Sequence, residues 1–136
     1  MVETGGGFIL LDVEPGDAGD FDRSMLERLG HPVEVCNGPE VRRLCPLLGG
    51  EGCENFEKAH GILFRLDLDR PQHRAIVARY RELAREDLPI RVMVRPGQAE
   101  RFADLLGRVE VWDHEPTVAD LDGFAAEVEA ADRLSD

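Results

Sequence analysis

Acidic residues in two turns of this sequence stand where a folded chain could present chemistry. Asp67 follows the short apolar stretch that begins at Ile62, and Pro71 then ends the strand and opens a helix. The apolar run Phe8–Leu11 ends in an acid-rich turn that contains Asp12 and Glu14. In an open parallel sheet, the loops at the carboxyl ends of the strands carry reactive and binding groups. Asp67 is therefore the central candidate, and the alternative is a strand-end carboxylate that pairs with a neighbouring base.

Three arginines stand close enough to these acids to be their partners. Arg95 follows the apolar stretch Leu88–Val94, and we expect its guanidinium to pair with Asp12 or Asp67, because arginine matches a carboxylate in a bidentate manner. A solvated loop arginine is the alternative. Arg65 and Arg91 lie inside predicted strands, where charges are rarely buried unpaired. They either pair with carboxylates or reach the edge of the sheet.

Cysteines form the second chemical constellation. Cys36, Cys45 and Cys53 fall within one short region. Three thiolates could bind a metal ion or an iron–sulfur cluster with a fourth ligand such as His31, His60 or Asp17, or could form a redox-switching disulfide. No C-x-x-C pair is present, so ordinary buried thiols are the alternative.

The elements that position these residues alternate in type along the chain. Short apolar runs predict strands at Phe8–Leu11, Val33–Cys36, from Ile62 into Asp67, Leu88–Val94 and Val109–Trp112. Apolar residues at helical spacing predict helices around residues 21–29, 41–48, 76–84, 102–106 and 117–128, the last opened by a capping box at Thr117. Residues 51–60 form the least regular segment. This alternation predicts an α/β fold with a parallel sheet.

Composition narrows the function classes further. The 136 residues suit one domain, and the net charge of −12 argues against binding of nucleic acid or of an anionic membrane surface. No signal peptide and no membrane-spanning apolar run is present, so we expect a soluble cytoplasmic protein. The acidic first turn repels phosphate, which argues against a nucleotide or flavin site. We find no catalytic constellation and expect that the chain is not an enzyme.

With this order of elements, the sequence resembles the receiver domain of two-component response regulators over Phe8 to Leu134. Asp67 with Pro71 matches the phosphoacceptor and its proline, Asp12 matches the first acid of the acidic pair, and Pro116 matches the proline of Lys-Pro. The resemblance implies a flavodoxin-like, doubly wound five-stranded parallel sheet of order 2-1-3-4-5 with helices on both faces. Residues 1–7 are expected to be a flexible N-terminus, and residues 8–134 a single receiver-like domain.

The departures from the receiver pattern concern the phosphorylation chemistry itself. Val13 stands in place of the second acid, Val94 in place of the hydroxyl residue, and Glu115 in place of the lysine. In receivers, the acids hold Mg²⁺, and the lysine and hydroxyl stabilise the phosphoryl group. Here Asp12 and Glu14 form a candidate acidic pocket, with Arg95 and Glu115 at its rim, and Mg²⁺ binding is expected to be weak or absent. A glutamate in place of the lysine disfavours an aspartyl phosphate.

These observations predict a stand-alone, atypical receiver that signals through protein–protein contact, without standard phosphorylation of Asp67. Arg95 would stand in for the missing lysine and metal. A cysteine-based redox, metal or iron–sulfur sensor on the same fold is one alternative. A phosphorylated single-domain regulator, in which Glu14 replaces the missing acid, is the other. The expected partner is a histidine kinase or a downstream effector. A homodimer of the chain is a further alternative.

Overall fold

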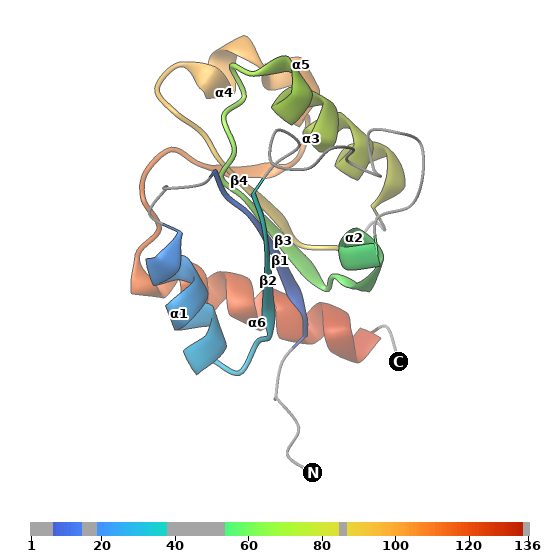
Figure 1. Cartoon of the computed structure of the whole chain (residues 1–136), viewed down its shortest axis with the longest axis vertical. Coiled ribbons are helices and arrows are strands. Elements are labelled where there is room, and N and C mark those ends of the chain that lie inside the picture. The colour runs from blue at the N-terminus through green and yellow to red at the C-terminus, as the bar shows by residue number, and fades with distance from the viewer. Residues whose placement is uncertain (1–6, 15–18, 38–53, 85–86, 135–136) are drawn as a thin grey trace.

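The computed structural model describes residues 7–14, 19–37, 54–84 and 87–134, and five parallel strands form one sheet in this part of the chain. The strands are β1 (Ile9–Asp12), β2 (Val33–Cys36), β3 (Gly61–Phe64), β4 (Ile90–Met93) and β5 (Glu110–Trp112). Their order is β2-β1-β3-β4-β5 (Figure 1). The predicted α/β class, parallel sheet and strand order are confirmed.

The central strands are continuous apolar runs because both of their faces are covered. Every residue of β1 and of β3 is buried, and Leu11 of β1 lies opposite Leu63 of β3 in the register. Strands buried on both sides need no polar alternation, which is why these runs were recognisable in the sequence.

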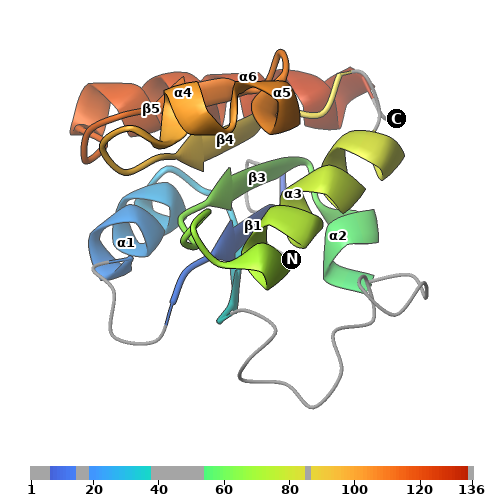
Figure 2. The ribbon, with the colours of Figure 1, turned by 90° about the horizontal axis from the view of Figure 1, so that it is seen from above.

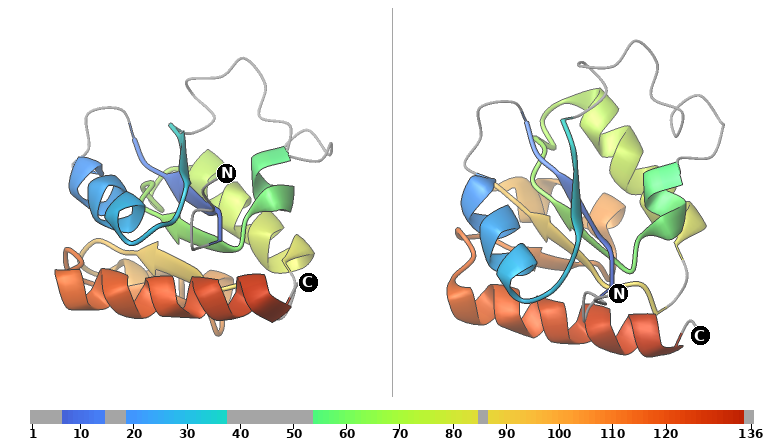
Figure 3. Two further views of the ribbon diagram at one scale, coloured as in Figure 1. Left: turned by 90° about the horizontal axis from the view of Figure 1, so that it is seen from below. Right: turned by 60° about the horizontal axis from the view of Figure 1, so that its bottom comes forward.

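Helices cover both faces of the sheet, as predicted. The helices α1 (Asp20–Arg28) and α6 (Val118–Leu134) lie on one face, and Figure 3 shows α1 in blue and α6 in red along one side of the strands. The opposite face carries α2 (Glu54–Lys58), α3 (Pro71–Leu83), α4 (Gln98–Arg101) and α5 (Ala103–Leu106), and Figure 2 shows α2 and α3 together beside β3. This is the doubly wound arrangement.

Two apolar clusters separate along these two faces. Leu26 of α1 and Phe124 of α6 pack with Leu63 on one face, whereas Phe56 of α2 and Tyr80 of α3 pack with residues such as Leu10 on the other. The rings of Phe56 and Tyr80 stack with their centroids 5.2 Å apart. Alternate residues of one strand therefore belong to different clusters, and this alternation decides where the polar residues at the strand ends point.

Some predicted boundaries differ from the structure. The least regular segment contains the helix α2, the helix predicted around residues 102–106 is preceded by the separate short helix α4, and the predicted helix at residues 41–48 lies outside the described residues. The third strand ends at Phe64 rather than running into Asp67. One further backbone bond, from Arg65 N–H to the Asp12 carbonyl oxygen (2.7 Å), continues the pairing before the chain turns.

Local polar contacts hold the start of α6 and the segment that precedes β1. The capping box predicted at Thr117 is present, since Thr117 N–H donates to Asp120 Oδ2 (2.9 Å) and Asp120 N–H donates to Thr117 Oγ1 (3.2 Å). Of the N-terminal residues 1–7, only Gly7 lies within the described part, and its carbonyl oxygen accepts a hydrogen bond from His31 Nδ1 (3.0 Å). None of the helices in the described ranges is long and apolar enough to cross a membrane.

Candidate functional site

Asp67 lies in the turn between β3 and α3, and both of its carboxylate oxygens are engaged. Oδ1 accepts hydrogen bonds from Asp69 N–H (3.0 Å) and from Gln98 Nε2 (2.9 Å). Oδ2 faces Arg95 Nη1 at 3.1 Å, and the side chain is 18% exposed. The carboxylate is therefore held in one orientation by donors from three directions.

Arg95 joins Asp67 to a second carboxylate. Its Nη2 atom lies 2.8 Å from Glu14 Oε1, in the loop after β1, so that one guanidinium bridges the loops after β1 and β3. The predicted pairing with Asp67 is confirmed, and the second partner is Glu14 rather than Asp12. Arg70 reaches the other oxygen of Glu14 at 3.5 Å. Positive and negative side chains therefore alternate at the carboxyl ends of the strands, in the order Arg70, Glu14, Arg95 and Asp67.

The backbone between β4 and α4 is built to place Arg95 and Gln98. Gly97 adopts a left-handed conformation (φ +82°), which glycine takes without strain, and this closes the turn that starts α4. Gln98 is fully buried, and its Oε1 accepts the Arg95 N–H (2.9 Å) while its Nε2 donates to Asp67. Gln98 thus ties the loop that carries Arg95 directly to Asp67.

The electrostatics of the site favour an ionised Asp67. Partial burial raises the pKa of Asp67, but hydrogen bonds from Asp69 N–H and Gln98, followed by the charge of Arg95, outweigh it. The net effect lowers the pKa of Asp67 below its ordinary value of 3.8. Asp67 is an anion whose charge is compensated within the protein.

Asp12 does not share this site. It is the last residue of β1 and points, like Leu10, toward the face of α3, where its Oδ2 accepts a hydrogen bond from Tyr80 Oη (2.6 Å). Burial raises the pKa of Asp12 to about 7, although hydrogen bonds from Tyr80 and Cys36 lower it. Glu14 lies beyond the end of β1, so the alternation of strand side chains between the two faces of the sheet does not determine the direction of its side chain. The predicted acidic pocket is thereby divided, with Glu14 beside Asp67 and Asp12 beneath Tyr80.

Glu115 likewise faces a different partner from the one its position suggests. Its two carboxylate oxygens accept hydrogen bonds from Nη1 and Nη2 of Arg65 (both 3.1 Å). Arg65 is 1% exposed and also donates to Asp22 Oδ2 of α1 (2.9 Å), so the pairing predicted for this buried arginine is confirmed. Arg65 lies on the same face of the sheet as Leu63, away from Asp12. The glutamate in the lysine position therefore neutralises a buried guanidinium.

The magnesium ion that the receiver resemblance implies does not fit these residues. The carboxylates of Glu14 and Asp67 are already bridged by Arg95, and Asp12 is buried against Tyr80. Mg²⁺ requires oxygen ligands in an octahedron. Here the guanidinium of Arg95 already occupies carboxylate oxygens that would have to bind the ion. Within the described ranges, no group of three His, Cys, Asp or Glu side chains could hold a metal ion.

The three-cysteine constellation falls mostly outside the described residues. Cys45 and Cys53 are not part of them, and Cys36 at the end of β2 is a half-buried thiol that hydrogen-bonds to Asp12. The histidines considered as further ligands have other contacts. His31 donates to Gly7, and His60 Nδ1 accepts the Phe8 N–H (3.1 Å). The metal and redox readings of the cysteines stay predictions.

Two residues of the site were missed or misplaced by sequence reasoning. His73, in the first turn of α3, is fully buried, and its Nδ1 accepts the Asp67 N–H (3.0 Å). Gln98 was not singled out. The available signals were the spacing of three residues from His73 to Ile76, which puts both on the inner face of α3, and the place of Gln98 directly after a glycine turn.

Comparison with known proteins places the fold but nothing finer. No family description and no curated protein sequence matches the chain. The receiver domain of a response regulator from Clostridium thermocellum is similar at 13% identity and a TM-score of 0.68, over 96% of this chain and 99% of that one. The Francisella response regulator 1452 receiver domain is similar at 11% identity and a TM-score of 0.61, over the same shares.

A response regulator receiver protein from Sinorhizobium medicae gives the same picture, with 15% identity and a TM-score of 0.65 over 93% of this chain and 96% of that one. At such identities the likeness concerns the fold alone. The chain has the five-stranded fold of receiver domains, and its chemistry must be argued from its own residues.

Proposed function

We propose that this chain is an atypical receiver-like domain that acts in signal transduction through contact with another protein, without phosphorylation of Asp67. The observation that carries the proposal is the bridge from Asp67 through Arg95 to Glu14, at 3.1 Å and 2.8 Å. The site with the place and fold of a phosphoacceptor already contains its own cation.

The chemistry of the bridge explains why phosphoryl transfer is disfavoured. A carboxylate attacks phosphorus with an oxygen lone pair, and both oxygens of Asp67 accept hydrogen bonds or face Arg95. A transferring phosphoryl group also needs cations that neutralise its oxygens. Arg95 is committed to two carboxylates, and Glu115, in place of the lysine, supplies no cation and is paired with Arg65. Asp67 and Glu14 are thus already paired with a cation of the protein, Arg95, when no phosphate donor is bound.

The same bridge supports a signalling surface with one fixed form. Because the guanidinium remains charged at all physiological pH values, the loops after β1, β3 and β4 are tied together without an added ion. The proposed partner is a protein, either a histidine kinase or a downstream effector, and a second copy of the chain is the other candidate. A cytoplasmic location is part of the same proposal.

Incubation with acetyl phosphate and Mg²⁺ tests the absence of phosphorylation. We expect no retarded band on a Phos-tag gel and no change in the NMR spectrum with beryllofluoride. Asp67→Asn is the matched control, since it removes the acceptor and keeps its shape. A retarded band that disappears in Asp67→Asn would overturn the proposal, and would support the regulator in which Glu14 replaces the missing acid.

The protein contact is tested separately with the immobilised chain. We expect the wild-type chain to retain the same partner with equal yield, with or without acetyl phosphate. A partner that is retained only after acetyl phosphate treatment would contradict a phosphorylation-independent contact. Metal analysis and thiol counting of the same preparation decide whether the cysteine-based alternative stands.

A further inference from the structure

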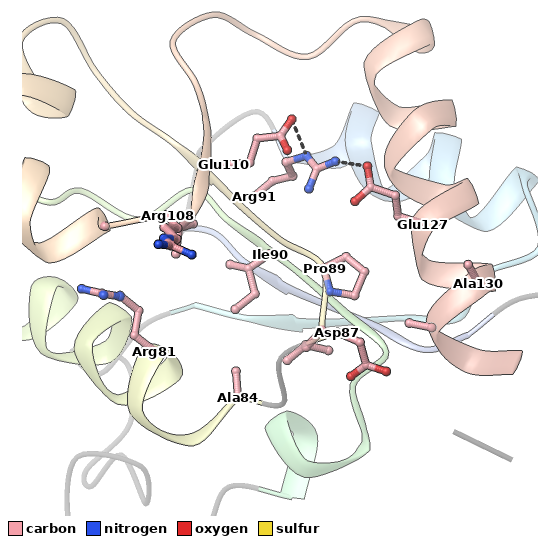
Figure 4. A pocket seen from close by; sticks show the side chains of 14 residues that line it. Arg81, Ala84, Asp87, Pro89, Ile90, Arg91, Arg108, Glu110, Glu127 and Ala130 are labelled. Atoms are coloured by element: carbon pink, nitrogen blue, oxygen red, sulfur yellow. Dashed lines mark hydrogen bonds and ion pairs between the residues drawn. The ribbon is translucent and has the colours of Figure 1, made fainter. Parts of the chain in front are cut away.

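A second concave site lies at the end of the sheet opposite to Asp67. A cavity of about 930 Å³ opens at the amino-terminal ends of β4 and β5, and the carboxyl-terminal part of α6 forms one of its walls (Figure 4). Its remaining walls come from the end of α3 and from the turn between α5 and β5. This volume falls in the range of sites for small ligands, about 300–1,000 Å³.

The interior of the cavity is lined by apolar side chains. Leu88, Pro89 and Ile90 line it at the start of β4, and Val109 lines it at the start of β5. Ile90 and Val109 are only partly buried, although both pack against the apolar cluster beneath them. The helices α4 and α5 contain four residues each. The apolar surface left in the cavity suits a flat or branched hydrocarbon body.

The charges around the cavity are unequally compensated. Figure 4 shows Arg91 between Glu110 and Glu127, and their Nε–Oε2 and Nη2–Oε2 separations are 3.7 Å and 2.5 Å. By contrast, Arg81 and Arg108 form no ion pair with a carboxylate among the residues that the structure describes. Arg81 and Arg108 therefore border the cavity without an ion-pair partner among the described residues, although the carboxylates of Asp87, Glu110 and Glu127 also line it.

The position of Arg81 is fixed by the local backbone. Its Nη1 donates to the carbonyl oxygens of Asp104 (3.1 Å) and Leu105 (2.7 Å), at the end of α5. Gly107 has a φ of +55°, and a Cβ there would lie 2.6 Å from Arg81 Nη2. Because glycine has no Cβ, the guanidinium of Arg81 can lie directly against Gly107, the residue before Arg108. Neutral carbonyl oxygens satisfy some of its donors but leave its charge in place.

We propose that this cavity binds a small organic anion, a carboxylate on an apolar body. The hydrocarbon would cover Ile90 and Val109, and the carboxylate would lie against Arg81 and Arg108. Guanidinium groups are suited to carboxylates, and burial of the hydrocarbon adds the non-directional part of the affinity. The site is independent of the function proposed for Asp67, because it uses no residue of that pocket.

Titration with 2-naphthoate and with the uncharged 2-naphthamide, followed by NMR of backbone amides, tests this site. We expect 2-naphthoate to shift the amides of Ile90, Val109 and Ala131 and to bind about tenfold more tightly than 2-naphthamide. Arg108 is the residue to change, since it is exposed and its side chain forms no ion pair with a described residue. Arg108→Gln should weaken 2-naphthoate binding by about tenfold and leave 2-naphthamide unchanged.

Arg28→Gln is the matched control, because Arg28 is an exposed arginine on α1 that does not line the cavity. Equal affinities for the two probes would overturn the proposal, as would equal weakening by Arg108→Gln and Arg28→Gln. Saturable 2-naphthoate shifts at Asp67 and Arg95 instead of the cavity, or no binding at millimolar probe, would also overturn it. Sedimentation that shows a dimer closed over the cavity would assign the surface to a second copy and would equally refute it.

Discussion

The stability of this protein should fall as the pH rises from acid to neutral, because of Asp12. Burial raises the pKa of Asp12 to about 7, against opposing hydrogen bonds from Tyr80 and Cys36. The unfolded chain keeps the ordinary value of 3.8, so the folded state binds more protons between these two values. The stabilising contribution is complete below the unfolded pKa and is lost as the pH rises through the folded one.

The size of the effect follows from the gap between the two pKa values. A gap of about three pH units, at ~1.4 kcal/mol each, corresponds to about 4 kcal/mol of unfolding free energy. Small domains have total stabilities of about 5–15 kcal/mol, so this one carboxyl group would alter a large share of the total. Asp12→Asn keeps the shape and an acceptor for Tyr80 Oη but removes the titration.

Urea unfolding followed by Trp112 fluorescence measures the contribution. Between about pH 4.5 and about pH 8.5, we expect Asp12→Asn to gain about 3 kcal/mol relative to wild type. The difference between the two proteins cancels the titration of the other carboxylates. A Tyr80→Phe variant, which removes the donor to the ionised form, should lose more stability at the high-pH end than at the low one.

A difference between wild type and Asp12→Asn that stays constant with pH would refute the reasoning. So would a carbon-13 NMR titration in which the Asp12 carboxyl carbon changes with a midpoint near the unfolded value. Either result would mean that water or a local opening solvates Asp12 despite its 1% exposure.

Three further substitutions have definite expected outcomes. Arg95→Ala should raise the pKa of Asp67 and strengthen Mg²⁺ binding in isothermal titration, because it removes the bridging cation; unchanged affinity would contradict its role. Arg65→Met should lower the unfolding free energy by about 3–5 kcal/mol in urea denaturation, because Asp22 stays buried beside a lost guanidinium; a loss below about 1 kcal/mol would show that Asp22 is solvated. Thr117→Ala should lower it by about 1 kcal/mol through loss of the α6 cap, and Thr117→Ser should retain the cap; equal losses in both would mean that the cap contributes nothing.

The sheet was predictable because its strands are apolar runs buried on both faces, such as Ile9–Leu11 and Ile62–Phe64. Their order in space was not readable from this pattern, since an apolar run does not specify its neighbours. It came from the receiver resemblance. The ends of the strands were less predictable, because the chain leaves β3 at Phe64 while apolar residues recur at Leu66 and Leu68.

The candidate site was predictable in its members more than in their pairing. Arg65 was recognisable as a buried charge that needed a carboxylate, but its partners lie 43 and 50 residues away in the sequence. Asp12 and Glu14 looked equivalent because they are neighbours in the sequence, whereas only Asp12 is still within a strand and follows its alternation. Gln98 was not predicted as a site residue, because an uncharged amide gives no indication in the sequence that it is buried.

The ion pair between Arg65 and Glu115 also constrains how this sequence could change through evolution. A Glu115→Lys substitution would place a second cation beside a fully buried guanidinium, with Asp22 shared between them. Replacing Arg65 first would remove that conflict but would leave Asp22 buried beside an apolar residue. Each order should pass through a less stable intermediate sequence. Epistasis among these three positions should therefore hinder the appearance of a lysine at position 115.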